Sequence, residues 1–354
     1  MTAGDPVGRS FGRLPDGRDV RVVTIGRAPG PVVEVLTLGA TVHRLEVTGR
    51  DGVRRNVVLG LADVDQRLAS SSYIGGTIGR YANRIAAGSF TLDGREVQVL
   101  THERGNSLHG GPDGFDVRLW EVVEQGPDEV VLTLTSPDGD QGFPGAVTAR
   151  VDYRVVGDTV AVTMEATTDA TTVVNLTNHA YFNLAGEGAG TIEDHLLRVE
   201  ADEFTPIGAT GIPLGAHAPV AGTALDLREA GEIGTALSSR HPQVLLVGGI
   251  DHNFVVRGSG LRRAAVLTSP DAATVLDLWS DQPGLQVYTG NALDGTHHSA
   301  AGARHHSRGG VALEPQLFPD SPNRPEWPSA TLRPGETYRS SIEWRFRTSD
   351  GATG

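Results

Sequence analysis

The heptapeptide Gly310-Val-Ala-Leu-Glu-Pro-Gln316 places one carboxylate directly after a short apolar run and directly before a proline. Proline fixes its own φ and biases the residue before it toward extended backbone. We therefore expect Glu314 to end a strand, held in one direction, where the chain leaves a sheet. Such a side chain suits a general base, which must lie within hydrogen-bond reach of one substrate proton. The position equally suits a salt-bridged residue at a sheet edge, so the heptapeptide alone does not distinguish a general base from a structural residue.

The rest of the chain predicts an all-β protein. Its 354 residues include 46 glycines and 20 prolines with little helical periodicity, which is typical of many short strands joined by turns. Residues 338–346 alternate between apolar and polar side chains, which predicts a final strand with one buried face. Further strands are expected in the β-rich segment 20–47 and at 130–135, 147–156, 159–167 and 286–291. Short helices are expected at 61–69 and near 228–237.

Two predicted hairpins complete the pattern. Residues 90–99 carry an Asp93-Gly94 turn, and residues 264–268 and 274–279 form the second pair of strands. No internal repeat or interdomain linker is present in the sequence. We therefore predict one large antiparallel β-sandwich, a single domain over residues 9–347, with loose tails at 1–8 and 348–354.

Composition excludes several classes of protein. The net charge is −13 and basic residues form no stripe, so nucleic acid and anionic membranes are not expected partners. The chain has no cysteine, which excludes disulfides and thiolate chemistry. No apolar run approaches the roughly 20 residues of a membrane span, and the N-terminus lacks a basic segment followed by an apolar one. We expect a soluble, cytoplasmic protein.

Two loops resemble ligand-binding motifs without completing them. The glycine-rich segment 75–84 lacks the Gly-Lys-Ser/Thr of a phosphate loop. The Asp138–Gly142 segment resembles a calcium loop, but Ala149 stands where the bidentate glutamate belongs, so we predict a turn. Neither loop predicts a bound ligand.

No sequence pattern predicts a metal site. His-Glu-x-x-His does not occur, and we expect no metal. The pairs His297-His298 and His305-His306 lie in a Gly/Ser/Ala-rich segment. We expect them in a solvated loop, with weak adventitious metal binding as the alternative.

Two histidines have polar surroundings. His109 lies between Asn106 and a Gly-Gly pair, which suits either a turn histidine or a ligand-facing imidazole that glycines leave accessible. His179 lies in a strand with Asn178, Tyr181 and Asn183 close by. A buried histidine paired with these neighbours and a functional imidazole remain equally open.

Two further positions carry charge beside turns. Asp251 follows Gly248-Gly249, where it starts a strand and either holds the turn or binds a ligand. Arg84 follows Asn83 and is either part of a surface turn or a ligand contact. None of these clusters is specific when taken alone.

Eight motifs, in order and spacing, resemble the aldose 1-epimerase (galactose mutarotase) family, and the resemblance covers roughly residues 11–346. They are Arg80-Tyr-Ala-Asn83-Arg84-Ile with Gly88-Ser-Phe, Asn106-Ser-Leu-His109-Gly-Gly, Gly142-Phe-Pro-Gly145, Asn175-Leu-Thr-Asn178-His179-Ala-Tyr-Phe-Asn183-Leu, Asp251-His-Asn-Phe254, Gln286-Val-Tyr-Thr-Gly-Asn291, Leu313-Glu314-Pro-Gln316 and Pro334-Gly-Glu-Thr-Tyr338. The sequence departs from the family at Tyr81, where many members carry valine, and in the histidine-rich segment 296–306.

The resemblance implies a cofactor-independent enzyme with a galactose mutarotase-like supersandwich fold that interconverts the α and β anomers of free aldoses. It implies that Glu314 is the catalytic base and His179 the catalytic acid. The substrate-binding residues that it implies are Arg84, Asn83, His109, Asp251 and Gln286.

The residue types fit that reaction on chemical grounds. Mutarotation needs a base for the C1 hydroxyl proton and an acid for the ring oxygen, and one carboxylate with one imidazole suffices. Arg84 and His109 would donate to substrate oxygens and carry developing charge. To act in both directions, His179 should keep a pKa near the operating pH.

Three alternatives remain. A hexose-6-phosphate 1-epimerase would need additional basic residues for the phosphate. A non-catalytic sugar-binding sandwich would keep the pocket without the chemistry. A glycoside hydrolase would need two carboxylates, for which Asp251 and Glu314 are available. The natural aldose is left open, and we expect a monomer or homodimer.

Overall fold

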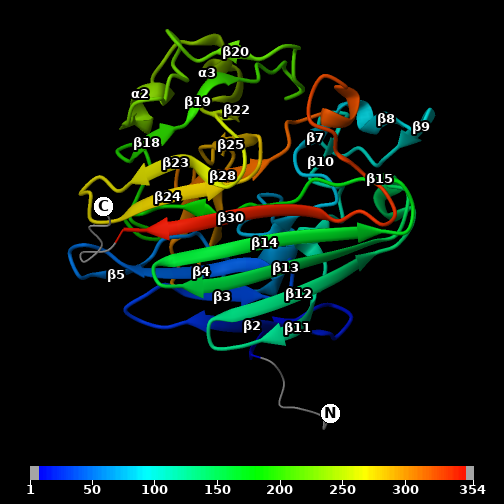
Figure 1. The fold of residues 1–354 in the computed structure, drawn as a ribbon. Helices are drawn as coiled ribbons and strands as arrows, with labels where there is room; N and C mark the ends of the chain where they lie inside the picture. The colour runs from blue at the N-terminus through cyan, green and yellow to red at the C-terminus, as the bar shows by residue number, and fades with distance from the viewer. Residues whose placement is uncertain (1–7, 348–354) are drawn as a thin grey trace.

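A computed structural model describes residues 8–347 as an antiparallel β-protein with three large sheets (Figure 1). Apart from Gly8, the tails predicted at 1–8 and 348–354 lie outside the described residues. No helix in residues 8–347 is long and apolar enough to cross a membrane.

The largest sheet has nine strands. In spatial order they are β11 (Glu121–Gln125), β12 (Glu129–Ser136), β13 (Val147–Val156), β14 (Thr159–Thr168), β30 (Tyr338–Phe346), β24 (Val275–Ser280), β23 (Arg262–Thr268), β18 (Leu196–Val199) and β21 (Gly231–Glu232).

A five-stranded sheet follows the chain order and a six-stranded sheet does not. The first comprises β1 (Arg9–Arg13), β2 (Asp19–Gly26), β3 (Val32–Leu36), β4 (Thr41–Thr48) and β5 (Arg54–Asn56). The second, in spatial order, comprises β17 (Tyr181–Phe182), β28 (Val311–Gln316), β25 (Gly284–Tyr288), β22 (Asp251–Val256), β19 (Ala201–Phe204) and β20 (Ala218–Pro219).

Short ribbons and helices connect these sheets. The two-stranded ribbons are β6 (Thr77–Ile78) with β16 (Thr177–Asn178), β7 (Arg84–Ile85) with β10 (Ser107–Leu108), β8 (Ser89–Leu92) with β9 (Arg95–Gln98), β15 (Thr172–Val173) with β29 (Thr331–Leu332), and β26 (Asp294–His298) with β27 (Arg304–His306). The α-helices within residues 8–347 are α1 (Val64–Ala69), α2 (Ile233–Leu237) and α3 (Pro242–Val247).

The sandwich core lies between the long strands and the N-terminal sheet. Figure 1 shows β12, β13, β14 and β30 side by side, with β2 to β5 behind them. β13 and β14 pair over ten residues without a register shift, and alternate side chains of each face inward. One hydrophobic cluster contains side chains from all three large sheets, among them Val35, Val162 and Val287. Because burying such side chains stabilises the fold by about 1.5–3 kcal/mol each, this core fixes the sheets on which the polar site lies.

Several sequence predictions are confirmed. The hairpin at 90–99, the hairpin at 264–279 and the final alternating strand all form. The helix expected at 61–69 begins only at Val64, because the Asp63 side chain accepts a hydrogen bond from the Gln66 N–H and so caps it. The 138–142 segment is a turn, and Asp138 accepts the Gly145 N–H.

Two predictions are wrong. The histidine pairs lie in the β26–β27 hairpin, not in a solvated loop, and His305 is buried with its Nε2 2.6 Å from the Gly60 carbonyl oxygen. Glu314 lies inside β28 and not at its end. The chain tolerates Pro315 there because β17 pairs only with Val311 and Ala312, which leaves the second half of β28 with a free edge.

Candidate active site

A cavity of about 420 Å³ opens above β22, β25 and β28, a volume in the usual range for small-molecule sites of about 300–1,000 Å³. All seven residues singled out from the sequence line it: Asn83, Arg84, His109, His179, Asp251, Gln286 and Glu314. The structure therefore brings together residues that lie up to 231 positions apart in the chain.

The sheet supplies the acidic side of the cavity. In the ladder, Gln286 of β25 lies opposite Glu314 of β28. Asp251 stands at the start of β22, and its Oδ1 accepts a hydrogen bond of 2.6 Å from Gln286 Nε2. Because all three side chains come from a continuous sheet, their relative positions are fixed by backbone register.

A short ladder supplies the opposite side. β7 pairs with β10, so that Leu108 lies opposite Arg84. Asn83 and His109 hydrogen-bond reciprocally: the His109 N–H donates to the Asn83 carbonyl at 3.1 Å, and the Asn83 N–H donates to His109 Nδ1 at 3.1 Å. Both have positive φ, and Gly110 follows where a Cβ would lie 2.0 Å from the Gly79 carbonyl oxygen.

The tautomer of His109 follows from this pairing. Since Nδ1 accepts a backbone N–H, the neutral ring carries its proton on Nε2. Burial, followed by the neighbouring His179, holds the pKa of His109 well below its ordinary value. His109 therefore presents a neutral N–H donor.

His179 lies between β16 and β17, and its backbone is fixed on both sides. Its N–H donates to the Gly76 carbonyl and its carbonyl accepts the Gly75 N–H, each at 2.9 Å. Its ring lies among those of Tyr73, Tyr181 and Tyr288, with centroids 5.8, 5.0 and 6.4 Å away. These aromatic side chains keep water from the imidazole and restrict its rotation.

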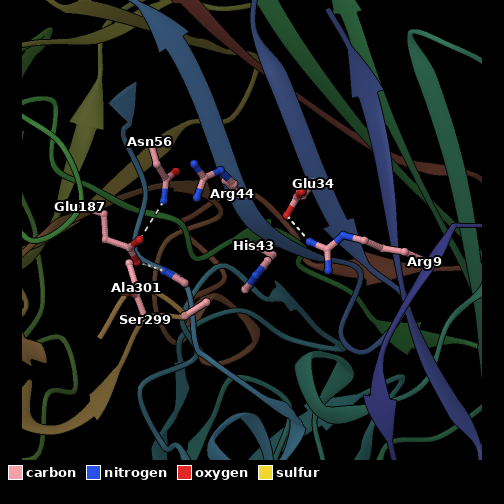
Figure 2. Close-up of a pocket in the computed structure, with 10 residues that line it drawn as sticks. Arg9, Glu34, His43, Arg44, Asn56, Glu187, Ser299 and Ala301 are labelled. Carbon is pink, nitrogen blue, oxygen red and sulfur yellow. Dashed lines mark hydrogen bonds and ion pairs between the residues drawn. The ribbon is translucent and has the colours of Figure 1, made fainter. Parts of the chain in front are cut away.

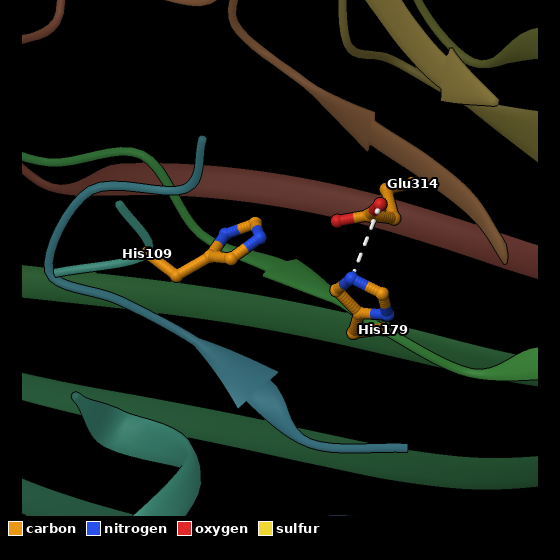
Figure 3. A group of neighbouring side chains, drawn as sticks. All are labelled: His109, His179 and Glu314. Atoms are coloured by element: carbon orange, nitrogen blue, oxygen red, sulfur yellow. Dashed lines mark ion pairs between the residues drawn. The ribbon is translucent and has the colours of Figure 1, made fainter. Parts of the chain in front are cut away.

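His179 and Glu314 face each other. His179 Nε2 lies 3.5 Å from Glu314 Oε1, and the two side chains are only 4% and 2% exposed (Figure 3). Burial lowers the pKa of His179 to about 4. Burial, and then the charge of Asp251, raises the pKa of Glu314 well above 4.5. The expectation that His179 keeps a pKa near the operating pH is therefore wrong, because solvation of the imidazolium is lost.

His109, His179 and Glu314 also form a group that sequence spacing did not reveal. Their potential ligand atoms lie within 4.8 Å of one another. Two imidazoles and one carboxylate suit a divalent cation in type. However, His109 Nδ1 is engaged by a backbone N–H and its Nε2 carries the proton, so the His109 ring is held as a donor and not as a ligand.

Arg84 is held by a residue that sequence reasoning missed. Its Nε donates to Glu103 Oε2 at 3.0 Å and its Nη2 to Glu103 Oε1 at 3.4 Å. The guanidinium packs on Gly211, where a Cβ would lie 2.7 Å from its carbon. Burial alone lowers the pKa of Arg84, but Asp251 and Glu103 more than offset this effect and raise it. Only the adjacency of Glu103 to the 106–111 motif could have signalled this role.

A second, smaller cavity of about 160 Å³ lies beside the five-stranded sheet (Figure 2). Its charged side chains are mostly paired: Arg9 with Glu34, and Glu187 with Asn56 and the Gly60 N–H. It contains none of the seven residues predicted for the site, so of these two cavities the one of about 420 Å³ is the candidate active site.

Comparisons with known proteins agree with this arrangement. The family model described as aldose 1-epimerase matches residues 21–345. The galactose mutarotase of Mus musculus is 40% identical over 95% of this chain and 97% of its own. The aldose 1-epimerase of Escherichia coli K12 is 41% identical over 94% and 96%.

Solved structures give the same result. A galactose 1-epimerase from Lactobacillus acidophilus superposes with a TM-score of 0.84 and 30% identity over 96% of this chain and 97% of its own. An aldose epimerase homologue from C. elegans gives 0.86 and 28% over 93% and 99%. The fold and site thus define a β-sandwich enzyme of the sugar isomerase class. The chain belongs to the aldose 1-epimerase family.

The contact between Glu103 and Arg84 yields a testable prediction. Glu103→Gln keeps the side-chain shape but removes the charge that orients the guanidinium, and hydrogen bonds to charged groups contribute about 1.5–3 kcal/mol. We expect kcat/KM for a free aldose to fall by about tenfold or more, mostly through a higher KM. Steady-state kinetics on Glu103→Gln and on Glu124→Gln, which removes an exposed ion pair with Arg150, tests this. Equal KM values in both variants would contradict it.

Proposed function

We propose that Glu314 and His179 interconvert the α and β anomers of free aldoses such as glucose and galactose by acid–base ring opening and closure. The observation that carries the proposal is the buried 3.5 Å contact between Glu314 Oε1 and His179 Nε2 on the wall of a sugar-sized cavity. The names of the relatives, galactose mutarotase and aldose 1-epimerase, support the substrate class.

The reaction divides between the two groups. Glu314 accepts the proton of the C1 hydroxyl while His179 donates to the ring oxygen, so the C1–O bond of the ring breaks and an aldehyde forms. Rotation about C1–C2 exposes the other face of the aldehyde. Ring closure then reverses both proton transfers, and the pair returns to its starting state without a net change.

The binding residues orient the sugar and stabilise the charge that develops on it. Arg84 and the Nε2–H of His109 donate to sugar oxygens, and Arg84 stabilises negative charge that develops during opening. Asp251, held by Gln286, accepts from sugar hydroxyls. Asn83 fixes the His109 ring through its backbone.

The pKa directions determine which protonation state is active. In the free enzyme His179 loses its proton near pH 4 and Glu314 only well above 4.5, so between these values the stable one-proton state has Glu314 protonated. The reactive state, ionised Glu314 with protonated His179, has the same number of protons but a smaller population. The pH dependence of kcat/KM therefore reports values that belong to the pair.

A sugar phosphate is a second candidate substrate, because two arginines, Arg84 and Arg104, line the cavity. Both already pair with Glu103, however, which leaves less free positive charge for a dianion. We favour free sugars for this reason.

From the sequence we also propose that residues 9–347 form one domain, which the core cluster shared by the three sheets supports. A cytoplasmic location and a monomer or homodimer complete the proposal.

Removal of either catalytic group tests the mechanism. Glu314→Gln cannot accept the C1 proton and His179→Asn cannot donate as an imidazolium, so each should lower kcat by at least about a hundredfold. The double variant should be little less active than the less active single variant, because the groups act as a unit. Polarimetry gives the rates, and circular dichroism checks folding.

The matched control is Glu187→Gln, which alters a half-buried carboxylate of the smaller cavity; this variant should keep its activity. If folded Glu314→Gln keeps more than about a tenth of the wild-type kcat, the loss is too small for a general base. In that event Glu314 does not have this role.

Substrate preference is tested with a panel of free and phosphorylated sugars. Because Glu103 engages both arginines, kcat/KM for glucose or galactose should exceed that for glucose 6-phosphate. Mutarotation monitored by NMR anomer exchange gives the comparison. A preference of about tenfold for the phosphate, which equals about 1.4 kcal/mol in the transition state, would establish the phosphosugar function instead.

A further inference from the structure

Two buried amides lie beside the catalytic residues and have no role in the mechanism above. Asn253 of β22 is 1% exposed and Gln316 of β28 is 0% exposed. Neither lines the large cavity. Both belong to sequence motifs already singled out, 251–254 and 313–316.

Sheet register places these amides on the face that carries Glu314. Asn253 lies opposite Gln286, which lies opposite Glu314. Gln316 lies two residues beyond Glu314 in the same strand and opposite Gly284. Because side chains two residues apart share a face, Asn253, Gln286, Glu314 and Gln316 project to the same side.

Gly284 lets the Asn253 amide lean toward Gln316. A Cβ on Gly284 would lie 2.7 Å from Asn253 Oδ1 and 2.9 Å from Nδ2. It would also lie 3.0 Å from the Gln316 carbonyl oxygen. The missing side chain thus makes room for an amide between Gln286 and Gln316.

This face of the sheet carries both donors and acceptors that have no hydrogen-bond partner. Among residues 8–347, neither nitrogen nor oxygen of the Asn253 and Gln316 amides has a hydrogen-bond partner, and neither does Gln286 Oε1 or Glu314 Oε2. The amide nitrogens are donors, whereas Glu314 Oε2 and Gln286 Oε1 are acceptors. Leaving each such group unpaired in the interior costs about 1–3 kcal/mol, so a bound water that joins a donor to an acceptor at neighbouring positions of the sheet would stabilise the site.

We propose that Gln316 and Asn253 are positioning residues for the catalytic pair, with Gln316 Nε2 linked to Glu314 Oε2, and Asn253 Nδ2 linked to Gln286 Oε1, each through one bound water. The inference rests on the proposed role of Glu314 as the base. Gln316 stabilises the ionised carboxylate and turns Oε1 toward His179. Asn253 fixes Gln286, whose Nε2 holds Asp251.

The substitutions that test this proposal leave the other charged groups around Glu314 unaltered. The titratable and charged groups that face its carboxyl are His109, His179, Arg84, Asp251, Tyr181 and Tyr288. None of the variants below alters any of them.

Gln316→Met removes the N–H donors with little change of volume. Without them the ionised form of Glu314 is less stable, so the protonated form is favoured and the reactive one-proton state becomes rarer. We expect the basic limb of the kcat/KM profile to move up by about one pH unit and the plateau to fall about tenfold, since one unit corresponds to a factor of ten. Above the basic limb, where the stable state of the pair has lost both protons, the rate should equal that of wild type.

The other variants separate the two amides. Asn253→Leu and Gly284→Ala, whose new Cβ displaces the Asn253 amide, should raise KM without moving the basic limb. Gln316→Asn keeps a buried amide but shortens its reach by one methylene, so it should reproduce the shift of Gln316→Met in a less altered interior. Thr274→Val, which removes a buried hydroxyl without a partner among the described residues, is the control and should match wild type.

Two results would overturn the inference. One is a basic limb at its wild-type position in both Gln316 variants. The other is a loss of kcat/KM that is equal at every pH, which indicates general disruption of the fold. Glu314→Gln is measured in the same series: if it stays active, the proposed function fails, whereas an inactive Glu314→Gln beside unshifted Gln316 variants refutes only the role of the amides.

Discussion

The site depends on holding a carboxylate and an imidazole 3.5 Å apart with almost no exposure to water. In water, the protonation state of the carboxylate would depend little on that of the imidazole. Burial moves the pKa of Glu314 up and that of His179 down, which makes one a stronger base and the other a stronger acid. In the proposed mechanism, the same loss of solvation suits them to exchange protons with the C1 hydroxyl and the ring oxygen of one sugar.

One side of this site lies on a large sheet, and the other side lies on loop residues next to short ladders. β28, β25 and β22 carry Glu314, Gln286 and Asp251 on one continuous sheet. On the facing side, His179 and His109 each directly follow a strand of a two-residue ladder. Sites on rigid elements hold a reacting geometry more accurately than loops do, and here the short ladders give loop residues comparable support.

The local sequence pattern predicts the long strands of this fold. For the site it predicts which residues take part, but not how tertiary packing arranges them. Residues 147–155 alternate between apolar and polar side chains, and the strand predicted over 147–156 is observed with the same bounds. The location of Glu314 inside a strand was missed because proline reads locally as a strand end, whereas the free edge that tolerates it is a tertiary feature. The Glu103–Arg84 pair was missed for a similar reason, since it depends on how two turns pack. The pKa of His179 is lowered by burial, to which Tyr73 and Tyr288, far away in the chain, contribute.

The central claim is that burial raises the pKa of Glu314 and so makes its carboxylate a stronger base than that of an exposed glutamate. A carbon-13 NMR titration of the glutamate side-chain carboxyls, with the Glu314 signal identified by its loss in Glu314→Gln, measures this directly in the free wild-type enzyme. The structure predicts that Glu314 titrates well above 4.5, after His179 has lost its proton near pH 4. A Glu314 carboxyl that titrates at or below 4.5 would contradict the account.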